Sequence, residues 1–349
     1  MINRKNKPEI VIGLFIIFFL LIFPFLSGAF HTGLMGKIIA FIILAIALDL
    51  VWGFTGLLSL GHAVFFGIGG YILALSYHFQ NGVPSFMTRF QITEIPLIMK
   101  PLTSLPIALV LGIILPGILA ALLGLFMFKG KVNGVYFAII TLALAALFQM
   151  LIENLQAYTG GSNGLTGLPR LPIFGEPFSL NTYYYIVLFI SIMVYLITRW
   201  LINSKFGRVI KSIRENEDRT LFFGYDANNY KIFIFGLSGM LSGLAGMLYV
   251  SMTGFISPTD VGFGLSTMLV LWVAIGGRGT LLGAVIGTLL INWLSNGLSE
   301  SYPDIWQLFL GLIMILVVLF LPDGIYGALI KRSGKKTFKF FGQRKDTTI

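Results

Sequence analysis

Cysteine is absent from this chain of 349 residues. Disulfide bridges, thiolate metal sites and cysteine nucleophiles are therefore excluded. Histidine is almost as scarce, because only His31, His62 and His78 occur and they are too scattered to suggest a metal site. The sequence also has no HExxH and no GxSxG motif, which argues against a metalloprotease or a serine hydrolase. We predict no catalytic residue, no metal and no cofactor.

The chain also lacks a phosphate-binding loop. The nearest match is Gly124-LFMFK-Gly130-Lys131-Val132. Its glycines are one residue too far apart, and valine replaces the Ser or Thr that would hold Mg²⁺. We therefore expect that this chain does not hydrolyse ATP.

Charge is the next scarce property. Only 11% of the residues are charged, against about 25% in an average soluble protein. Hydrophobic residues make up 56% of the chain, and the mean hydropathy is +0.90. This leaves too little polar surface to cover a water-soluble core. The apolar residues lie in blocks of about 20, the length that crosses a ~30 Å hydrocarbon layer as a helix.

These blocks predict an all-α polytopic membrane protein with about ten spans, broken or re-entrant segments and an internal repeat. We treat residues 1–349 as a single transmembrane domain with a basic tail at 329–349. The run at about 265–276 is too short to span alone, so the span count near 265–298 stays open. The expected spans are 10–29, 34–53, 57–77, 103–128, 132–152, 182–202, 232–253, 265–276, 281–298 and 305–328.

The placement of the basic residues predicts the orientation. A cytoplasmic N-terminus puts 20 of the 24 Lys and Arg residues on the inside, leaving Lys37, Arg89, Lys100 and Arg170 elsewhere. Both termini are then cytoplasmic, and the basic tail is expected near anionic lipid of the plasma membrane. The net charge of +10 is explained by this pattern, so nucleic acid is not an expected partner. The apolar run 10–29 is longer than a signal-peptide core and is interpreted as a retained first span.

Glycine and proline interrupt the spanning pattern in four places. Loops 78–102 and 153–181 are expected to form tight turns, either as simple connections or over the mouth of a pore. The segments 53–70 and 274–287 resemble the broken helices of a transporter pathway. Close helix packing explains most of their glycines better, and the breaks at 59–62 and 276–280 are the better pathway candidates. We predict the pathway at Ser59, Gly61, His62, Phe66, Gly276, Gly277 and Thr280.

Polar residues inside the spans are further candidates, because charge at membrane depth is costly. Asp49 lies close enough to the inner end of its span to reach interfacial water, or it serves a function. His62 can hydrogen-bond either a substrate or a backbone carbonyl. Hydroxyl and amide side chains that bridge helices or line a polar path are found at Ser59, Thr141, Ser238, Ser242 and Asn292.

One dense patch of charge, residues 203–231, holds six Lys or Arg and four Asp or Glu. Its apolar residues recur at helical spacing from Phe206 to Ile213. Asn216 is a good N-cap and Gly224 a good terminator, so we predict two short helices joined near 215–216. The aromatic residues on the second helix suit either a docking knob or the lipid interface.

The residues DLVWGFTGLLSLGHAVFFGIGGYILA at 49–74 resemble ABC-importer permeases of the branched-chain amino acid and urea type. IRENEDRTLFFGYDANNYKIFIFGLSGMLSGLAGMLY at 213–249 resembles the cytoplasmic coupling segment of that family. The resemblance covers about 35–328. Segments 273–292 and 303–327 favour the urea branch, because Arg278, Thr280 and Ala284 depart from the amino acid pattern.

The resemblance implies a non-enzymatic transport subunit that pairs with a homologous second permease, two cytoplasmic ATPase subunits and an extracytoplasmic substrate-binding protein. Its leading substrate is urea or a similar small amide, and the alternative is a branched-chain amino acid. A zwitterion would need charged groups or helix ends along the path to compensate its charges, whereas the pathway candidates are mostly neutral. An ATP-independent channel or secondary transporter and a membrane enzyme are rivals of other classes. The ATPase-docking residues are predicted to be Arg208, Arg214, Glu215, Asn216, Glu217, Arg219 and Gly224.

Overall fold

Long apolar helices account for most of the computed structural model, which describes residues 7–132, 134–173, 176–302, 305–320 and 324–327. Nine helical segments of these residues are long and apolar enough to cross a membrane, so the predicted all-α polytopic class is confirmed. Each of the ten expected spans coincides with a long helix. The long helices are α1 Lys7–Leu26, α2 Ala29–Thr55, α3 His62–Gln80, α5 Leu105–Lys129, α6 Val135–Asn154, α8 Leu180–Asn203, α11 Ala227–Thr253, α12 Phe263–Gly276, α13 Leu281–Ser301 and α14 Trp306–Phe320.

The helix α12 is short, as its brief apolar run predicts. A 3-10 turn, η4 (Pro258–Asp260), precedes it, and together they make a candidate span of 19 residues, Pro258–Gly276. In the described part of α14 there are 15 residues, fewer than the roughly 20 that a perpendicular span needs.

The centre of the bundle is α2, which is hydrophobic on every side and therefore suits a fully enclosed position. In its most apolar window 89% of the residues are buried, whereas the figure for α1 is 6%. Helix α11 packs against α2, α3 and α5. Helix α1 lies at the side of the bundle, where Tyr184 of α8 donates a hydrogen bond to the carbonyl of Leu20 over 2.8 Å.

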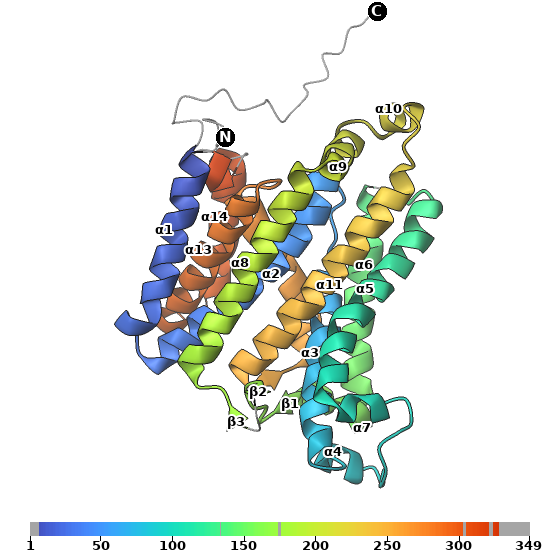
Figure 1. Cartoon of the computed structure of the whole chain (residues 1–349), viewed down its shortest axis with the longest axis vertical. Helices are drawn as coiled ribbons and strands as arrows, with labels where there is room; N and C mark the ends of the chain where they lie inside the picture. The colour runs from blue at the N-terminus through green and yellow to red at the C-terminus, as the bar shows by residue number, and fades with distance from the viewer. Residues whose placement is uncertain (1–6, 133, 174–175, 303–304, 321–323, 328–349) are drawn as a thin grey trace, which may run out of the picture.

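Short elements fill the two ends of the bundle. At one end lie the start of α1 and two short helices, α9 (Lys205–Glu215) and α10 (Glu217–Phe222). At the opposite end lie α4 (Ser85–Thr88), α7 (Gln156–Thr159) and the strands β1 (Leu165–Thr166), β2 (Pro172–Ile173) and β3 (Glu176–Pro177) (Figure 1). The charged patch and the two Gly- and Pro-rich loops thus lie at opposite ends, as the predicted topology requires.

The two long loops contain turns, as expected from their glycines and prolines. The first contains α4 and the 3-10 helix η2 (Lys100–Thr103), and the second contains α7 and η3 (Gly161–Asn163). Strand β1 pairs antiparallel with β4 (Phe255–Ile256), with Leu165 opposite Ile256, and β2 pairs with β3. The second loop is therefore fixed to the connection between α11 and α12.

Some expectations fall outside what the structure describes. The basic tail at 329–349 and the C-terminus lie outside the described residues. The internal repeat, the domain assignment and the orientation of the termini in the membrane stay predictions.

Candidate translocation and coupling site

The charged patch forms the two short helices that its pattern predicts. Helix α9 begins after Ser204, whose hydroxyl accepts from the Gly207 amide over 3.3 Å. Asn216 separates α9 from α10 and caps α10, because its side-chain oxygen accepts from the Arg219 amide over 2.8 Å. Gly224 follows α10 with a φ of +84°, the left-handed conformation expected of a terminator.

The outer face of α9 and α10 is exposed. Leu221, Phe222 and Phe223 are 47%, 89% and 70% exposed, which is unusual for large apolar side chains at the polar end of a bundle. Most of the residues predicted to dock an ATPase are also exposed: Arg208, Glu215, Asn216, Arg219 and Gly224. Their role in docking stays a prediction.

The two remaining docking candidates lie against the chain's own helices. Glu217 accepts from the Lys231 ammonium over 2.6 Å, and Lys231 is only 3% exposed. Arg214 of α9 donates from Nη1 to the carbonyl of Gly53, one of the last carbonyls of α2. A cation suits this position, because the C-terminal end of a helix carries partial negative charge. Both residues therefore join the patch to the bundle.

The second helix break, the connection between α12 and α13, contacts the same end of α2. Asp49 is completely buried, and its Oδ1 accepts from the Gly279 amide over 2.7 Å. Gly279 itself lies beside Arg214 and Gly53, so close that a methyl group on it would be 3.0 Å from the guanidinium. We call Asp49, Gly53, Arg214 and Gly279 the Asp49–Arg214 cluster. It ties α9, α2 and the loop before α13 together.

Charge at this cluster is concentrated on two arginines and one carboxylate. Arg278 lies over the Trp52 ring, with 5.2 Å from its guanidinium carbon to the ring centroid. Burial lowers the pKa of Arg214, while the carboxylates of Glu215 and Asp49 raise it. Asp49 thus acts electrostatically on Arg214 of α9 from inside the bundle. Its position at the end of its span does not leave it in interfacial water.

Glycines at the second break bring α12 and α13 together. A methyl group on Gly276 would lie 1.9 Å from the carbonyl oxygen of Gly283, and one on Gly287 would lie 2.0 Å from that of Trp272. These two positions match the packing alternative. The Thr280 hydroxyl donates to the Gly277 carbonyl. Gly276, Gly277 and Thr280 thus lie at the tight connection between α12 and α13, which contacts the end of α2 through Gly279 and Asp49.

The first break brings a buried histidine into the bundle. Helix α3 begins at His62, whose Nε2 lies 2.6 Å from the Ser238 hydroxyl of α11. Ser238 donates its only proton to the carbonyl of Ala47 in α2 over 2.7 Å. His62 must therefore donate from Nε2, which leaves Nδ1 as an acceptor. This Nδ1 is buried and has no hydrogen-bond partner among the described residues.

Further polar groups surround His62. The Leu60 amide donates to Thr141 of α6 over 3.0 Å, and the Ala63 amide donates to Ser266 of α12 over 3.3 Å. Ser59 is buried, and a methyl group on Gly61 would be 2.6 Å from the Thr141 carbonyl. The predicted residues Ser59, Gly61 and His62 are thus brought together in one polar cluster with Thr141, Ser238 and Ser266. Four helices contribute to it.

Phe66, the fourth candidate from this break, lies one turn further along α3 in an aromatic cluster. Its ring centroid is 5.2 Å from that of Tyr249 and 5.9 Å from that of Phe41. Phe41 stacks on Tyr249 at 5.2 Å and meets Trp272 at 5.0 Å. The aromatic cluster of Phe41, Phe66, Tyr249 and Trp272 is buried throughout.

Two charged residues beyond the aromatic cluster were not among our candidates. The Lys37 ammonium lies over the Phe41 and Tyr249 rings, at 5.7 and 5.8 Å from their centroids. The Tyr249 hydroxyl lies 3.2 Å from Oδ1 of Asp260, whose Oδ2 accepts from the Ser257 amide and hydroxyl. A lone lysine within an apolar run was the available signal for Lys37. Nothing in the sequence connects it with Asp260.

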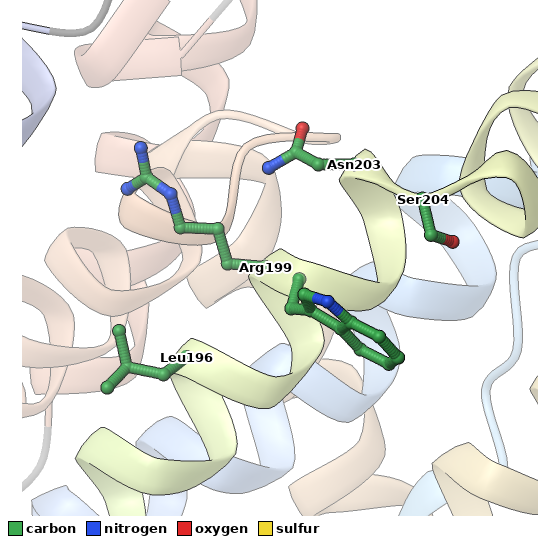
Figure 2. Close-up of a pocket in the computed structure, with 5 residues that line it drawn as sticks. Leu196, Arg199, Asn203 and Ser204 are labelled. Carbon is green, nitrogen blue, oxygen red and sulfur yellow. The ribbon is translucent and has the colours of Figure 1, made fainter. Parts of the chain in front are cut away.

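A separate cavity of about 340 Å³ opens at the end of α8 that adjoins α9. Figure 2 shows Leu196, Arg199, Asn203 and Ser204, which line it from the last turns of α8 and the residue after them. Arg199 forms an ion pair with Glu9 of α1 over 2.8 Å. The exposed Trp200 also lines the cavity, a composition typical of the membrane interface.

Comparison with known proteins identifies the family. Residues 30–318 match the family described as the permease component of the branched-chain amino acid transport system. The chain belongs to this permease family. The matched range includes both helix breaks, the α9–α10 element and the Lys37 and Asp260 positions.

Among its relatives is the high-affinity branched-chain amino acid transport system permease protein LivM of Salmonella typhimurium, 25% identical over 86% of this chain and 71% of the relative. The probable LivM protein of Methanocaldococcus jannaschii is 23% identical over 81% of this chain and 89% of its own length. The ribose import permease protein RbsC of Haemophilus influenzae is 28% identical over 64% and 68%. No solved structure matches the chain.

These findings support the predicted importer permease, which is a transport component of the membrane. The named relatives act on branched-chain amino acids or ribose, so the predicted preference for urea receives no support from them. They agree better with the stated alternative, a branched-chain amino acid, than with the urea preference based on Arg278, Thr280 and Ala284.

Proposed function

We propose that this chain is one permease subunit of an ATP-driven plasma-membrane importer for branched-chain amino acids. It pairs with a homologous permease, two cytoplasmic ATPase subunits and an extracytoplasmic binding protein. The α9–α10 end faces the cytoplasm in this proposal, and the β1–β4 end faces the binding protein. Positively charged loops at the α9–α10 end favour this orientation.

The observation that carries the proposal is the connection between the α9–α10 element and the helix breaks. Its exposed surface, centred on Phe222 and Phe223, offers apolar area and charge to a soluble partner. Its inner side is fixed to α2 through Arg214 and Gly53, and α2 is fixed to the second break through Asp49 and Gly279. A movement imposed on α9 by an ATPase would therefore reach the pathway helices directly.

The substrate class rests on the relatives' names and on charge. Urea is neutral and needs only uncharged hydrogen-bonding groups, whereas an amino acid brings a carboxylate and an ammonium group into the membrane. Lys37 and Asp260 supply opposite charges within candidate spans, where charge is otherwise costly. They favour a zwitterion over urea as the cargo.

The test uses the complete complex, with both permeases, the ATPases and the binding protein, reconstituted in proteoliposomes. We expect ATP-dependent uptake of labelled leucine, isoleucine and valine, with no uptake of labelled urea above empty vesicles. Uptake of urea in place of leucine would restore the urea hypothesis. Leucine uptake that does not depend on ATP would instead favour a channel or secondary transporter.

A further inference from the structure

Lys37 and Asp260 both contact Tyr249, at the end of the bundle opposite to α9. Lys37 is in the third turn of α2, and Asp260 is in η4, immediately after the strand β4 that pairs with β1. Asp260 is the carboxylate that acts electrostatically on Lys37. Within the described chain, however, no salt bridge joins them, and no carboxylate lies within ion-pair distance of the Lys37 ammonium.

The Lys37 ammonium therefore has donors to spare. It lies over the faces of Phe41 and Tyr249, which attract a cation. The ammonium has three N–H donors, and these ring faces are not conventional hydrogen-bond acceptors for them. Lys37 itself is only partly exposed. An incoming carboxylate could take these donors without breaking a contact that the described structure contains.

Asp260 is held in place but not saturated. Its two oxygens accept from the Ser257 amide at 2.9 Å, the Ser257 hydroxyl at 3.0 Å and the Tyr249 hydroxyl at 3.2 Å. A carboxylate has about four acceptor positions, so one remains for a further donor. Nearby, the Tyr71 hydroxyl is buried and has no hydrogen-bond partner among the described residues.

We propose that Lys37 and Asp260 bind the head group of a zwitterionic amino acid as it enters the permease, Lys37 taking the carboxylate and Asp260 the ammonium group. The unpartnered Tyr71 hydroxyl supplies an additional hydrogen bond. Tyr249 contacts both charged residues, and in this proposal its ring and that of Phe41 meet the apolar side chain. The inference rests on the proposed function, because it names the groups that recognise its substrate.

The order of residues along three helices supports an entry position. In α2 the order is Lys37, Phe41 and Ala47, the last of which contacts the polar cluster through Ser238. In α3 it is Tyr71, Phe66 and His62, and in α11 it is Tyr249 followed by Ser238 towards the other end. We call Lys37 and Asp260 the charged pair. Each helix thus passes from the level of the charged pair through the aromatic cluster to the polar cluster. The charged pair is the outermost of the three.

The experiment compares Lys37→Met, Lys37→Arg and Asp260→Asn in the complete reconstituted complex, supplied with leucine-loaded binding protein. Uptake of labelled leucine and ATP hydrolysis are measured on the same vesicles. We expect Lys37→Met and Asp260→Asn to lower leucine uptake per ATP by roughly 10- to 100-fold, the effect of losing a hydrogen bond to a charged group. Lys37→Arg keeps the charge and should retain most of the uptake.

Matched controls are Lys100→Met and Glu94→Gln, which change exposed charges on the first loop at the same end. They should leave uptake unchanged, and ATPase activity stimulated by the binding protein should survive in all variants. If Lys37→Met and Asp260→Asn transport leucine as well as the controls do, the head-group site is wrong while the proposed function stands. If uptake and ATPase activity fall together, the two residues stabilise the fold only. If the unaltered complex takes up urea and no amino acid, both inferences fall.

Discussion

Replacing Arg214 with alanine tests whether the Asp49–Arg214 cluster couples the ATPase to the pathway. The sequence alone predicts that Arg214 touches the ATPase, so that a change there should weaken the association of the two subunits. The contact with Gly53 changes this expectation, because the guanidinium is directed towards α2. We now expect Arg214→Ala to leave the ATPase bound and to uncouple ATP hydrolysis from uptake.

The magnitude follows from the contact that is lost. A hydrogen bond from a charged donor contributes about 1.5–3 kcal/mol, and a cation at a helix C-terminus contributes roughly 0.3–1 kcal/mol more. Since Arg214 is half-buried, we take about 2 kcal/mol as the free energy by which the attachment of α9 to α2 weakens. At about 1.4 kcal/mol per factor of ten, the ratio of attached to detached α9 falls roughly 30-fold.

The assay measures labelled leucine taken up per ATP hydrolysed in proteoliposomes containing the complete complex. Arg208→Ala is the matched control, because Arg208 is on the same helix but exposed. We expect Arg214→Ala to lower uptake per ATP, by up to about 30-fold, with the ATPase still co-purifying. Arg208→Ala should instead reduce co-purification and leave uptake per bound ATPase unchanged. An Arg214→Ala complex that falls apart, or that transports normally, would refute the reasoning.

Two further predictions concern stability, measured by thermal unfolding in detergent. Glu217→Gln leaves the buried Lys231 without its 2.6 Å carboxylate partner and should cost about 1–3 kcal/mol, whereas the exposed neighbour Asp218→Asn should cost almost nothing. Equal effects would show that the Glu217–Lys231 pair contributes little. Gly276→Ala places a methyl group 1.9 Å from the Gly283 carbonyl and should cost about 1–3 kcal/mol or more. The control is Gly297→Ala in α13, whose methyl group would meet no atom within 4 Å and should be neutral or slightly stabilising. If Gly276→Ala is tolerated as well as this control, α12 and α13 are not closely packed.

Helix positions and helix ends could be predicted from the sequence, because they depend on signals that lie within or next to each helix. The long apolar blocks predicted every long helix, because a span must satisfy its backbone hydrogen bonds internally and its length is set by the bilayer. Asn216 and Gly224 predicted the limits of α10, because a cap and a left-handed terminator act on neighbouring residues. The break at His62 was visible from the glycines around it.

The direction of individual side chains was not predictable in the same way. Arg214 and Arg208 lie on the same short helix, and nothing local shows that one meets Gly53 while the other is exposed. Lys37 and Asp260 are more than two hundred residues apart, and only the packing of α2, α11 and η4 brings them to one place. Contacts between distant segments therefore decided which polar residues form a site.

Helix α2 connects both helix breaks, the aromatic cluster and Lys37, and its construction suits that role. It has 27 residues and no internal proline, so it spans about 40 Å without the usual cause of a kink. Along it lie Lys37 of the charged pair and Phe41 of the aromatic cluster. Further along, Ala47 contacts the polar cluster, Asp49 contacts the second break and Gly53 contacts α9. Because α2 is closely packed and has no internal proline, we expect a displacement of its end at Gly53 to move the whole helix as a rigid body. In the proposed importer, the force from the ATPase and the recognition of the substrate thus act on opposite ends of a single rigid helix.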